Sequence, residues 1–194
     1  HFSFTQQVRL ELKLMLKGRS VYWFIGLLIL ILTQLFISES LLISLVLPIS
    51  WLWCVLVLSQ LGQLDKQSNT VELVTYSKQA PMRQIFARYT ASWLLLAIVS
   101  LGSVIRFIGA SEWLLLVQLL VAISFSVSLA YLCGVYTGSK RMFEVLYPAI
   151  WYLGPIQAAV YVDFFGVNSE SSWQAGMPYF FLAMTGIMLM LTIR

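Results

Sequence analysis

The chain has 194 residues, of which 60% are hydrophobic and only 10% are charged. About a quarter of the residues in a soluble domain are charged, because such residues cover its surface. The composition therefore excludes a disordered chain, argues against a water-soluble globule, and predicts an all-α protein that crosses a membrane several times. The formal net charge of +4 does not require nucleic acid as a partner, because the basic residues follow a membrane pattern.

The segment 2–18 is predicted to form an amphipathic helix that lies in the headgroup plane of the membrane. Apolar residues recur on one face and basic residues on another: Phe4, Val8, Leu12, Met15 and Leu16 against Arg9, Lys13 and Lys17. Gly18 allows a bend at the end of this helix. The alternative is a straight cytoplasmic extension of the first membrane span.

Six apolar stretches follow that are each long enough to cross a hydrocarbon core of about 30 Å. They cover residues 20–37, 41–61, 89–105, 113–136, 145–162 and 177–193. The fold class is therefore an all-α polytopic bundle of six transmembrane helices with an N-terminal interfacial helix, in one domain over residues 1–194.

The loop 62–88 between the second and third stretches is the longest connection, and loops of this length usually carry function or are disordered. Asn69 with Glu72 fits a helix N-cap and its capping box. Pro81 begins a second helix, with an apolar stripe and an opposite polar face: Met82, Ile85, Phe86 and Tyr89 against Arg83, Gln84 and Arg88. The loop is either a lid over the bundle or a docking surface for a soluble partner.

The fourth and fifth stretches carry packing and kink signals. Small residues recur every fourth position in the fourth stretch and predict close helix packing: Ala122, Ser126, Ala130, Gly134 and Gly138. In the fifth, Pro148 and the pair Gly154-Pro155 each interrupt an α-helix. These residues form either hinges or the lining of a translocation path, or they are static packing kinks.

The basic residues predict the sidedness of the membrane spans. One side carries Arg9, Lys13, Lys17, Arg19, Lys66, Lys78, Arg83, Arg88, Lys140, Arg141 and Arg194, and the other side carries only Arg106. Because Lys and Arg concentrate in cytoplasmic loops, both termini are expected in the cytoplasm and the protein in the cytoplasmic membrane. The same residues would contact anionic membrane lipid.

Residues that carry catalysis are scarce. The six apolar stretches contain no Asp, Glu, Lys, Arg or His, and the only histidine is His1. The chain has no G-x-x-x-x-G-K-[ST], G-x-S-x-G, H-E-x-x-H or C-x-x-C motif. We therefore expect no enzyme activity, cofactor or metal site, and interpret Cys54 and Cys133 as core residues.

Two segments add a resemblance to this layout: SNTVELVTYSKQAP (68–81) and LCGVYTGSKRMFEVLYPAIWYLGPIQAAVYVDFFG (132–166). With them, the chain resembles ABC transporter type 2 permeases, the membrane subunits of exporters driven by a separate ATPase. The sequence departs from the usual loop pattern at Asn69, where a glycine is common, and at residues 78–80.

The resemblance implies partners and contact residues. Residues 2–18 would be the elbow helix, residues 163–176 would lie over the exit of a translocation path, and a second permease half would complete that path. The helix near 70–77 would seat on the ATPase through Thr70, Glu72, Leu73, Val74 and Tyr76. A second ATPase contact would comprise Lys140, Arg141 and Glu144. The alternatives are a non-transporting scaffold or assembly subunit and, third, a membrane enzyme acting on lipid.

Overall fold

The computed structural model describes residues 3–61, 80–157, 160–165 and 169–193, and all its regular elements in these ranges are helical. In chain order they are α1 (Phe4–Leu16), α2 (Val21–Phe36), α3 (Glu39–Leu41), the π-helical turn η1 (Leu42–Val46), α4 (Leu47–Trp53), α5 (Val55–Leu58), α8 (Ala80–Val99), α9 (Leu101–Gly109), α10 (Trp113–Thr137), α11 (Lys140–Trp151), the π-helical turn η2 (Tyr152–Ile156), the 3₁₀ turn η3 (Val160–Val162), α12 (Ser169–Gln174) and α13 (Met177–Ile193).

Two to four helical segments of the described chain could cross a membrane. Glu39–Leu58 and Trp113–Thr137 are each long and apolar enough alone. Two bent pairs could each form another span: α1 with α2, bent by 109°, and Arg83–Val99 with α9, bent by 63°. Helix α13 is apolar but shorter. The protein is thus a helical bundle with the composition of a membrane protein.

The bend between α1 and α2 follows from local residue types. Ser3 and Gln6 form a capping box that starts α1: the Ser3 hydroxyl accepts from the Gln6 N–H at 3.3 Å, and the Gln6 side chain accepts from the Ser3 N–H at 2.9 Å. Gly18 has a φ of +83°, which glycine adopts without steric cost. Ser20 then caps α2 by accepting from the Trp23 N–H. Residues 4–36 are therefore two helices rather than one straight extension.

Prolines accompany the two π-helical turns. Pro48 is the second residue of α4, which begins directly after η1, and Pro155 lies within η2. A proline has no N–H to donate to the residue four positions earlier, and a π-helical turn accommodates this loss. The predicted stretch 145–162 is consequently not one α-helix: α11 ends at Trp151, and η2 and η3 follow.

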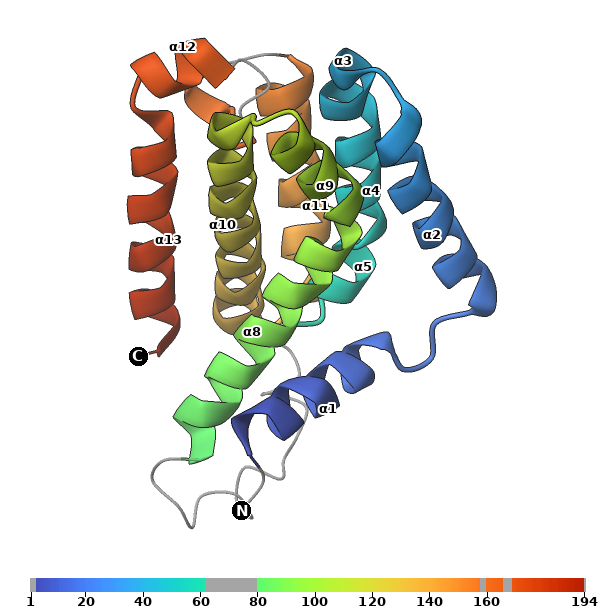
Figure 1. The fold of residues 1–194 in the computed structure, drawn as a ribbon. Helices are drawn as coiled ribbons and strands as arrows, with labels where there is room; N and C mark the ends of the chain where they lie inside the picture. Colours follow the sequence, from blue (N-terminus) through green and yellow to red (C-terminus); the bar gives the residue numbers. More distant parts are fainter. Residues whose placement is uncertain (1–2, 62–79, 158–159, 166–168, 194) are drawn as a thin grey trace.

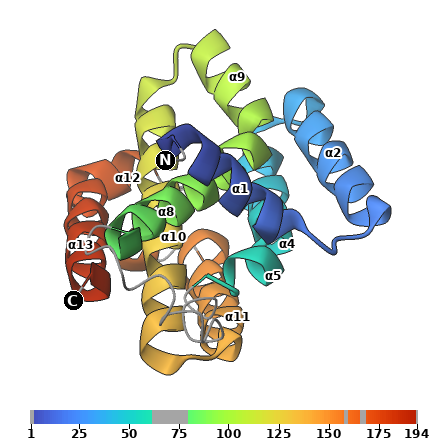
Figure 2. The ribbon, with the colours of Figure 1, turned by 90° about the horizontal axis from the view of Figure 1, so that it is seen from below.

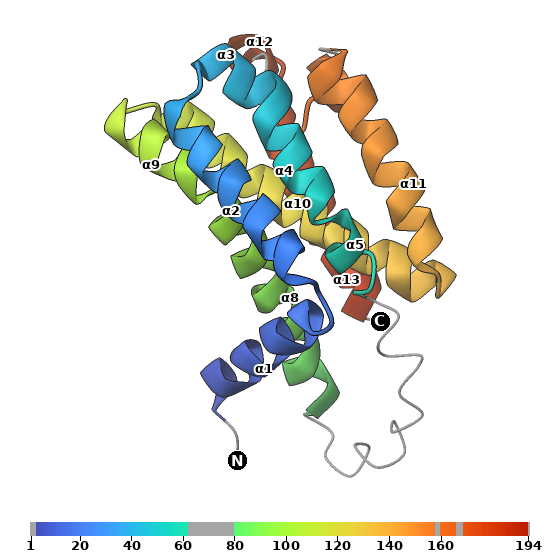
Figure 3. The same cartoon turned by 90° about the vertical axis from the view of Figure 1, so that its right-hand side faces the viewer.

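Helix α10 lies at the centre of the bundle. It packs against α13, α11, α8 and α9, while α2 packs on α9 and α4 at the periphery. Successive segments (α2, α3–α5, α8–α9, α10, α11 and α13) run in alternating directions between the two ends of the bundle (Figures 1 and 3). Seen from below, α1 crosses α8 at one end (Figure 2).

Aromatic side chains fill the core between α4, α11 and the segment after η3. Trp51 and Trp151 meet edge-to-face at 5.8 Å between ring centroids, and Phe165 contacts both rings. Phe164 packs on Trp151 at 5.0 Å. Each such pair contributes about 0.5–1.5 kcal/mol beyond its buried area. Residues 163–165 are thereby held inside the bundle, and the carboxylate of Asp163 accepts from the Ser172 hydroxyl of α12 at 3.0 Å.

Candidate functional site

One end of the bundle, which we call the basic end, is formed by α1, α5, the first half of α8 and the turn between α10 and α11 (Figures 1 and 3). It carries the described basic residues Arg9, Lys13, Lys17, Arg19, Arg83, Arg88, Lys140 and Arg141. Arg106, at the C-terminal end of α9, lies at the opposite end and donates to the backbone carbonyls of Gln34 and Ile37. The basic end therefore has a positive field that attracts anionic groups.

Helix α1 docks along α8 at the basic end through one buried face. Val8, Glu11 and Met15 are its buried residues. Glu11 bonds Arg88, and the Ser92 hydroxyl one turn along α8 contacts the Met15 sulfur at 3.7 Å. Two successive turns of each helix are thus matched, and α1 and α8 form one packed unit.

The ion pair between Glu11 and Arg88 is the main polar feature of this contact. Arg88 Nε donates to Glu11 Oε2 at 3.0 Å, and Arg88 Nη2 donates to Glu11 Oε1 at 3.5 Å. The side chains are only 4% and 9% exposed. Two parallel bonds fix the relative orientation of the planar groups. Loss of one partner would leave the other charge buried and uncompensated.

The polar face predicted for the helix after Pro81 differs from the observed one. Arg88 was expected opposite the apolar stripe but is buried under α1, whereas Phe86 is 48% exposed. Tyr89 and Trp93 turn toward α10, where they donate to the Ser124 carbonyl and the Ser124 hydroxyl. The reason is that α1 covers the face of α8 that carries Arg88 and supplies a carboxylate to it. The sequence signal was present, because Glu11 lies in helical register with Val8 and Met15.

The turn between α10 and α11 presents two exposed cations. Gly138 ends α10 with a φ of +60°, and the Ser139 hydroxyl accepts from the Arg141 N–H to start α11. Lys140 and Arg141 are exposed. Glu144, predicted to belong to the same contact, is half-buried and accepts from the Ser59 hydroxyl at 3.0 Å. Lys140 and Arg141 are therefore accessible, whereas the Glu144 carboxylate is bonded to Ser59, the residue that follows α5.

The predicted small-residue face of α10 is packed over four of its five positions. Ala122, Ser126, Ala130 and Gly134 are buried. Ser126 lies 2.9 Å from the Tyr147 hydroxyl, which donates to it, so α11 covers this face. Gly138 does not continue the face, because it lies beyond the last residue of α10 in a left-handed conformation. Its role is to end the helix.

The residues predicted to seat on an ATPase through the loop (Thr70, Glu72, Leu73, Val74 and Tyr76) lie outside the described residues. The ends of the described chain on either side, after α5 and at the start of α8, both lie at the basic end (Figure 3).

The predicted hinge residues lie on α11 and η2, away from the basic end. Pro148 is inside α11 and half-buried. Gly154 lies against the backbone of Val162, where a Cβ atom would overlap the Val162 carbonyl oxygen. Gly154 thus allows the chain after η2 to return close to η2. This close approach favours a fixed kink over a freely moving one at this position.

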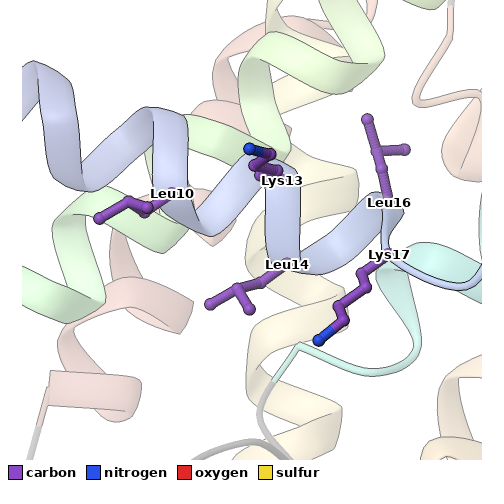
Figure 4. Close-up of a pocket in the computed structure, with 5 residues that line it drawn as sticks. All are labelled: Leu10, Lys13, Leu14, Leu16 and Lys17. Carbon is purple, nitrogen blue, oxygen red and sulfur yellow. The ribbon is translucent and has the colours of Figure 1, made fainter.

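An open pocket runs along the exposed side of α1. The described residues that line it are Leu10, Lys13, Leu14, Leu16 and Lys17, and Figure 4 shows Lys13 and Lys17 on either side of the helix. The pocket places leucine side chains beside lysine ammonium groups, a combination that fits an amphipathic anion with an apolar tail.

The described residues hold no group of three or more His, Cys, Asp or Glu side chains that could bind a metal ion. Cys54 and Cys133 are buried free thiols. A comparison of the chain with protein-family models, curated proteins and solved structures found no match.

Proposed function

We propose that this chain is the membrane permease subunit of an exporter driven by a separate ATPase, of the ABC transporter type 2 kind. It crosses the cytoplasmic membrane six times, over the predicted stretches 20–37, 41–61, 89–105, 113–136, 145–162 and 177–193. Its basic end faces the cytoplasm. The observation that carries the proposal is the buried Glu11–Arg88 pair, which joins α1 to the helix that follows the loop 62–79.

The distribution of charge supports this orientation. All described basic residues except Arg106 belong to elements at the basic end, and Lys and Arg are retained on the cytoplasmic side of membrane proteins. Helix α1 lies across the bundle at this end (Figure 2), as an interfacial helix would. Lys13 and Lys17 would then meet anionic headgroups, while the leucines beside them meet acyl chains.

The mechanism follows from the connection between the loop and α8. ATP-dependent closure of the partner displaces the predicted coupling loop 62–88, whose last residues belong to α8, and this displacement pulls or pushes the N-terminal end of α8. Because α1 is fixed to α8 by a buried ion pair, both helices move as one body. The movement reaches the core through α8, which packs on α10. Alternating access between two halves then needs no ionisable group within the spans.

Thiol labelling from the two sides of intact vesicles tests the orientation. In a Cys54→Ala, Cys133→Ala background, Lys140→Cys at the basic end and Ala110→Cys at the opposite end provide a matched pair of exposed positions. A membrane-impermeant reagent is expected to reach only Ala110→Cys from the periplasmic side. Labelling of both positions from one side would contradict the orientation.

Co-purification tests the partner. The double variant Glu72→Ala, Leu73→Ala is expected to lose a stoichiometric soluble ATPase on purification from native membranes and to lose substrate-stimulated ATP hydrolysis. Glu112→Ala, at the opposite end of the bundle, is the control and should keep both. Unchanged recovery and hydrolysis in the double variant would remove the assignment of the loop as the ATPase contact.

A further inference from the structure

The break between α8 and α9 contains an inserted side chain from another helix. Gln34 of α2 is fully buried. Its Oε1 accepts from the Ser103 N–H at 3.1 Å and from the Ser103 hydroxyl at 2.9 Å. Its Nε2 donates to the Val99 carbonyl at 2.9 Å and to the Ser50 hydroxyl at 3.2 Å. The side-chain amide therefore uses both of its donors and accepts two bonds.

The two backbone groups that Gln34 binds are partners in an uninterrupted helix. A residue's N–H bonds the carbonyl four positions earlier, which pairs Ser103 with Val99. Here the Gln34 amide stands between them and bonds each one. Ser100 N–H still bonds the Leu96 carbonyl, and Val104 N–H still bonds the Ser100 carbonyl. Ser100 belongs to neither helix, so the regular ladder is interrupted around it, and Gln34 bonds the Val99 carbonyl on one side of the break and the Ser103 N–H on the other.

Neighbouring residues hold α4 and α2 against the break. The Trp51 indole N–H donates to the Ser100 hydroxyl at 2.9 Å. Gly102 lets α2 approach the break, because a Cβ there would lie 2.6 Å from the Ile31 carbonyl oxygen. Insertion of a side chain into the ladder is a known cause of sharp kinks, and the chain bends by 63° at this point.

We propose that the α8–α9 break is a hinge with two hydrogen-bonded states and that Gln34 is the positioning residue that selects the bent one. In the bent state, Gln34 bonds Val99 and Ser103. In the straight state, Val99 and Ser103 bond each other and Gln34 is withdrawn. In each state the Val99 carbonyl and the Ser103 N–H both have a partner, as an apolar surrounding requires of backbone polar groups. The inference concerns the fold and does not depend on the proposed transport activity.

The distance between spin labels on α8 and α9 measures the state of the hinge. Phe86 and Ile108 are about half exposed and lie on opposite sides of the break. With a rise of 1.5 Å per residue, their Cα atoms are about 28 Å apart at a bend of 63° and about 33 Å apart in a straight helix. The two states therefore differ by about 5 Å, which pulsed electron paramagnetic resonance resolves.

Gln34→Met is the test variant, because it keeps the side-chain volume and removes both hydrogen-bonding atoms. It is expected to lengthen the distance by about 5 Å, or to add a population at that distance, since Val99 and Ser103 then satisfy each other. The matched control is Gln118→Met, because Gln118 is also buried but its amide has no hydrogen-bond partner among the described residues. The control should leave the distance unchanged. An unchanged distance in folded Gln34→Met would overturn the proposal.

Ser103→Pro provides a second test that does not require Gln34→Met to fold. Proline has no N–H, and its ring clashes with the carbonyl four positions earlier, so Ser103→Pro excludes the straight state. The substitution also removes both Ser103 donors to Gln34 Oε1, so the bent distance expected for it comes from this steric exclusion. Ser103 is the third residue of α9, within the first turn, where proline is tolerated. Ser103→Pro is expected to keep the bent distance, and in the Gln34→Met background to restore it. A straight distance in either variant would show that the Val99–Ser103 bond is not the alternative partner.

Discussion

Removing either member of the Glu11–Arg88 pair is expected to release α1 from α8. The pair is almost completely buried and its closest atoms are 3.0 Å apart. Breaking such a pair by removing one partner costs about 3–5 kcal/mol, because the other charge stays buried. Replacing both partners by apolar residues of similar size is often neutral. Glu11→Leu and Arg88→Met should therefore each be severe, and the double variant mild.

The effect can be measured as the exposure of a buried residue of α1. Met15 is 4% exposed and contacts α8, so Met15→Cys in a Cys54→Ala, Cys133→Ala background reacts with a soluble thiol reagent only when α1 undocks. A loss of about 3 kcal/mol raises the undocked fraction, and hence the rate, by about 100-fold, because each 1.4 kcal/mol is tenfold. The double variant should return to within about tenfold of the parent rate.

Arg9→Met is the matched control, because Arg9 is an exposed arginine on the same helix. Its labelling rate should stay within about twofold of the parent rate, since surface charges contribute little. Rates in Glu11→Leu and Arg88→Met no higher than in the control would refute the reasoning. The ion pair would then not hold α1 in place.

Two further substitutions test the core by thermal unfolding in detergent. Gly154→Ala should destabilise the protein by about 1–3 kcal/mol, since its Cβ would overlap the Val162 carbonyl oxygen and force the backbone apart. The control is Gly186→Ala, where a Cβ meets nothing within 4 Å, and it should be neutral or slightly stabilising. Equal effects of the two substitutions would contradict this account. Tyr147→Phe should cost about 1 kcal/mol by removing the 2.9 Å bond to the Ser126 hydroxyl, and it should cost less in a Ser126→Ala background. Additive losses would show that this bond does not couple the two residues.

The positions of the helices along the chain could be predicted from the sequence, because they depend on residues that are close together in the sequence. The predicted stretches 20–37, 113–136 and 177–193 coincide closely with α2 (21–36), α10 (113–137) and α13 (177–193). Apolar length, glycine at a turn and serine at an N-cap are all read within one or two turns of helix. The same local rules placed the bend at Gly18.

Helix interruptions were accessible only where a breaking residue lies in the chain itself. The pair Gly154-Pro155 marked the disruption after α11, and η2 lies there. The break at Ser100 has no proline beside it, and the sequence predicts one continuous span over residues 89–105. The side chain that bonds both edges of the break is Gln34, which lies 69 positions from Ser103. No periodicity in residues 89–105 contains that information.

Composition and residue order were enough to predict that lipid surrounds this protein and that its basic residues are distributed asymmetrically. The first follows from composition, since too few charges remain to cover a globule, and the second from the positions of the cations, because all the described ones except Arg106 belong to elements at the basic end. The pairing of buried polar groups, by contrast, is visible only in the folded chain. Glu11 reaches Arg88 across 77 positions, and Gln34 enters another helix. A buried charge or amide requires a partner in an apolar interior, but the folded arrangement of helices selects which one it meets.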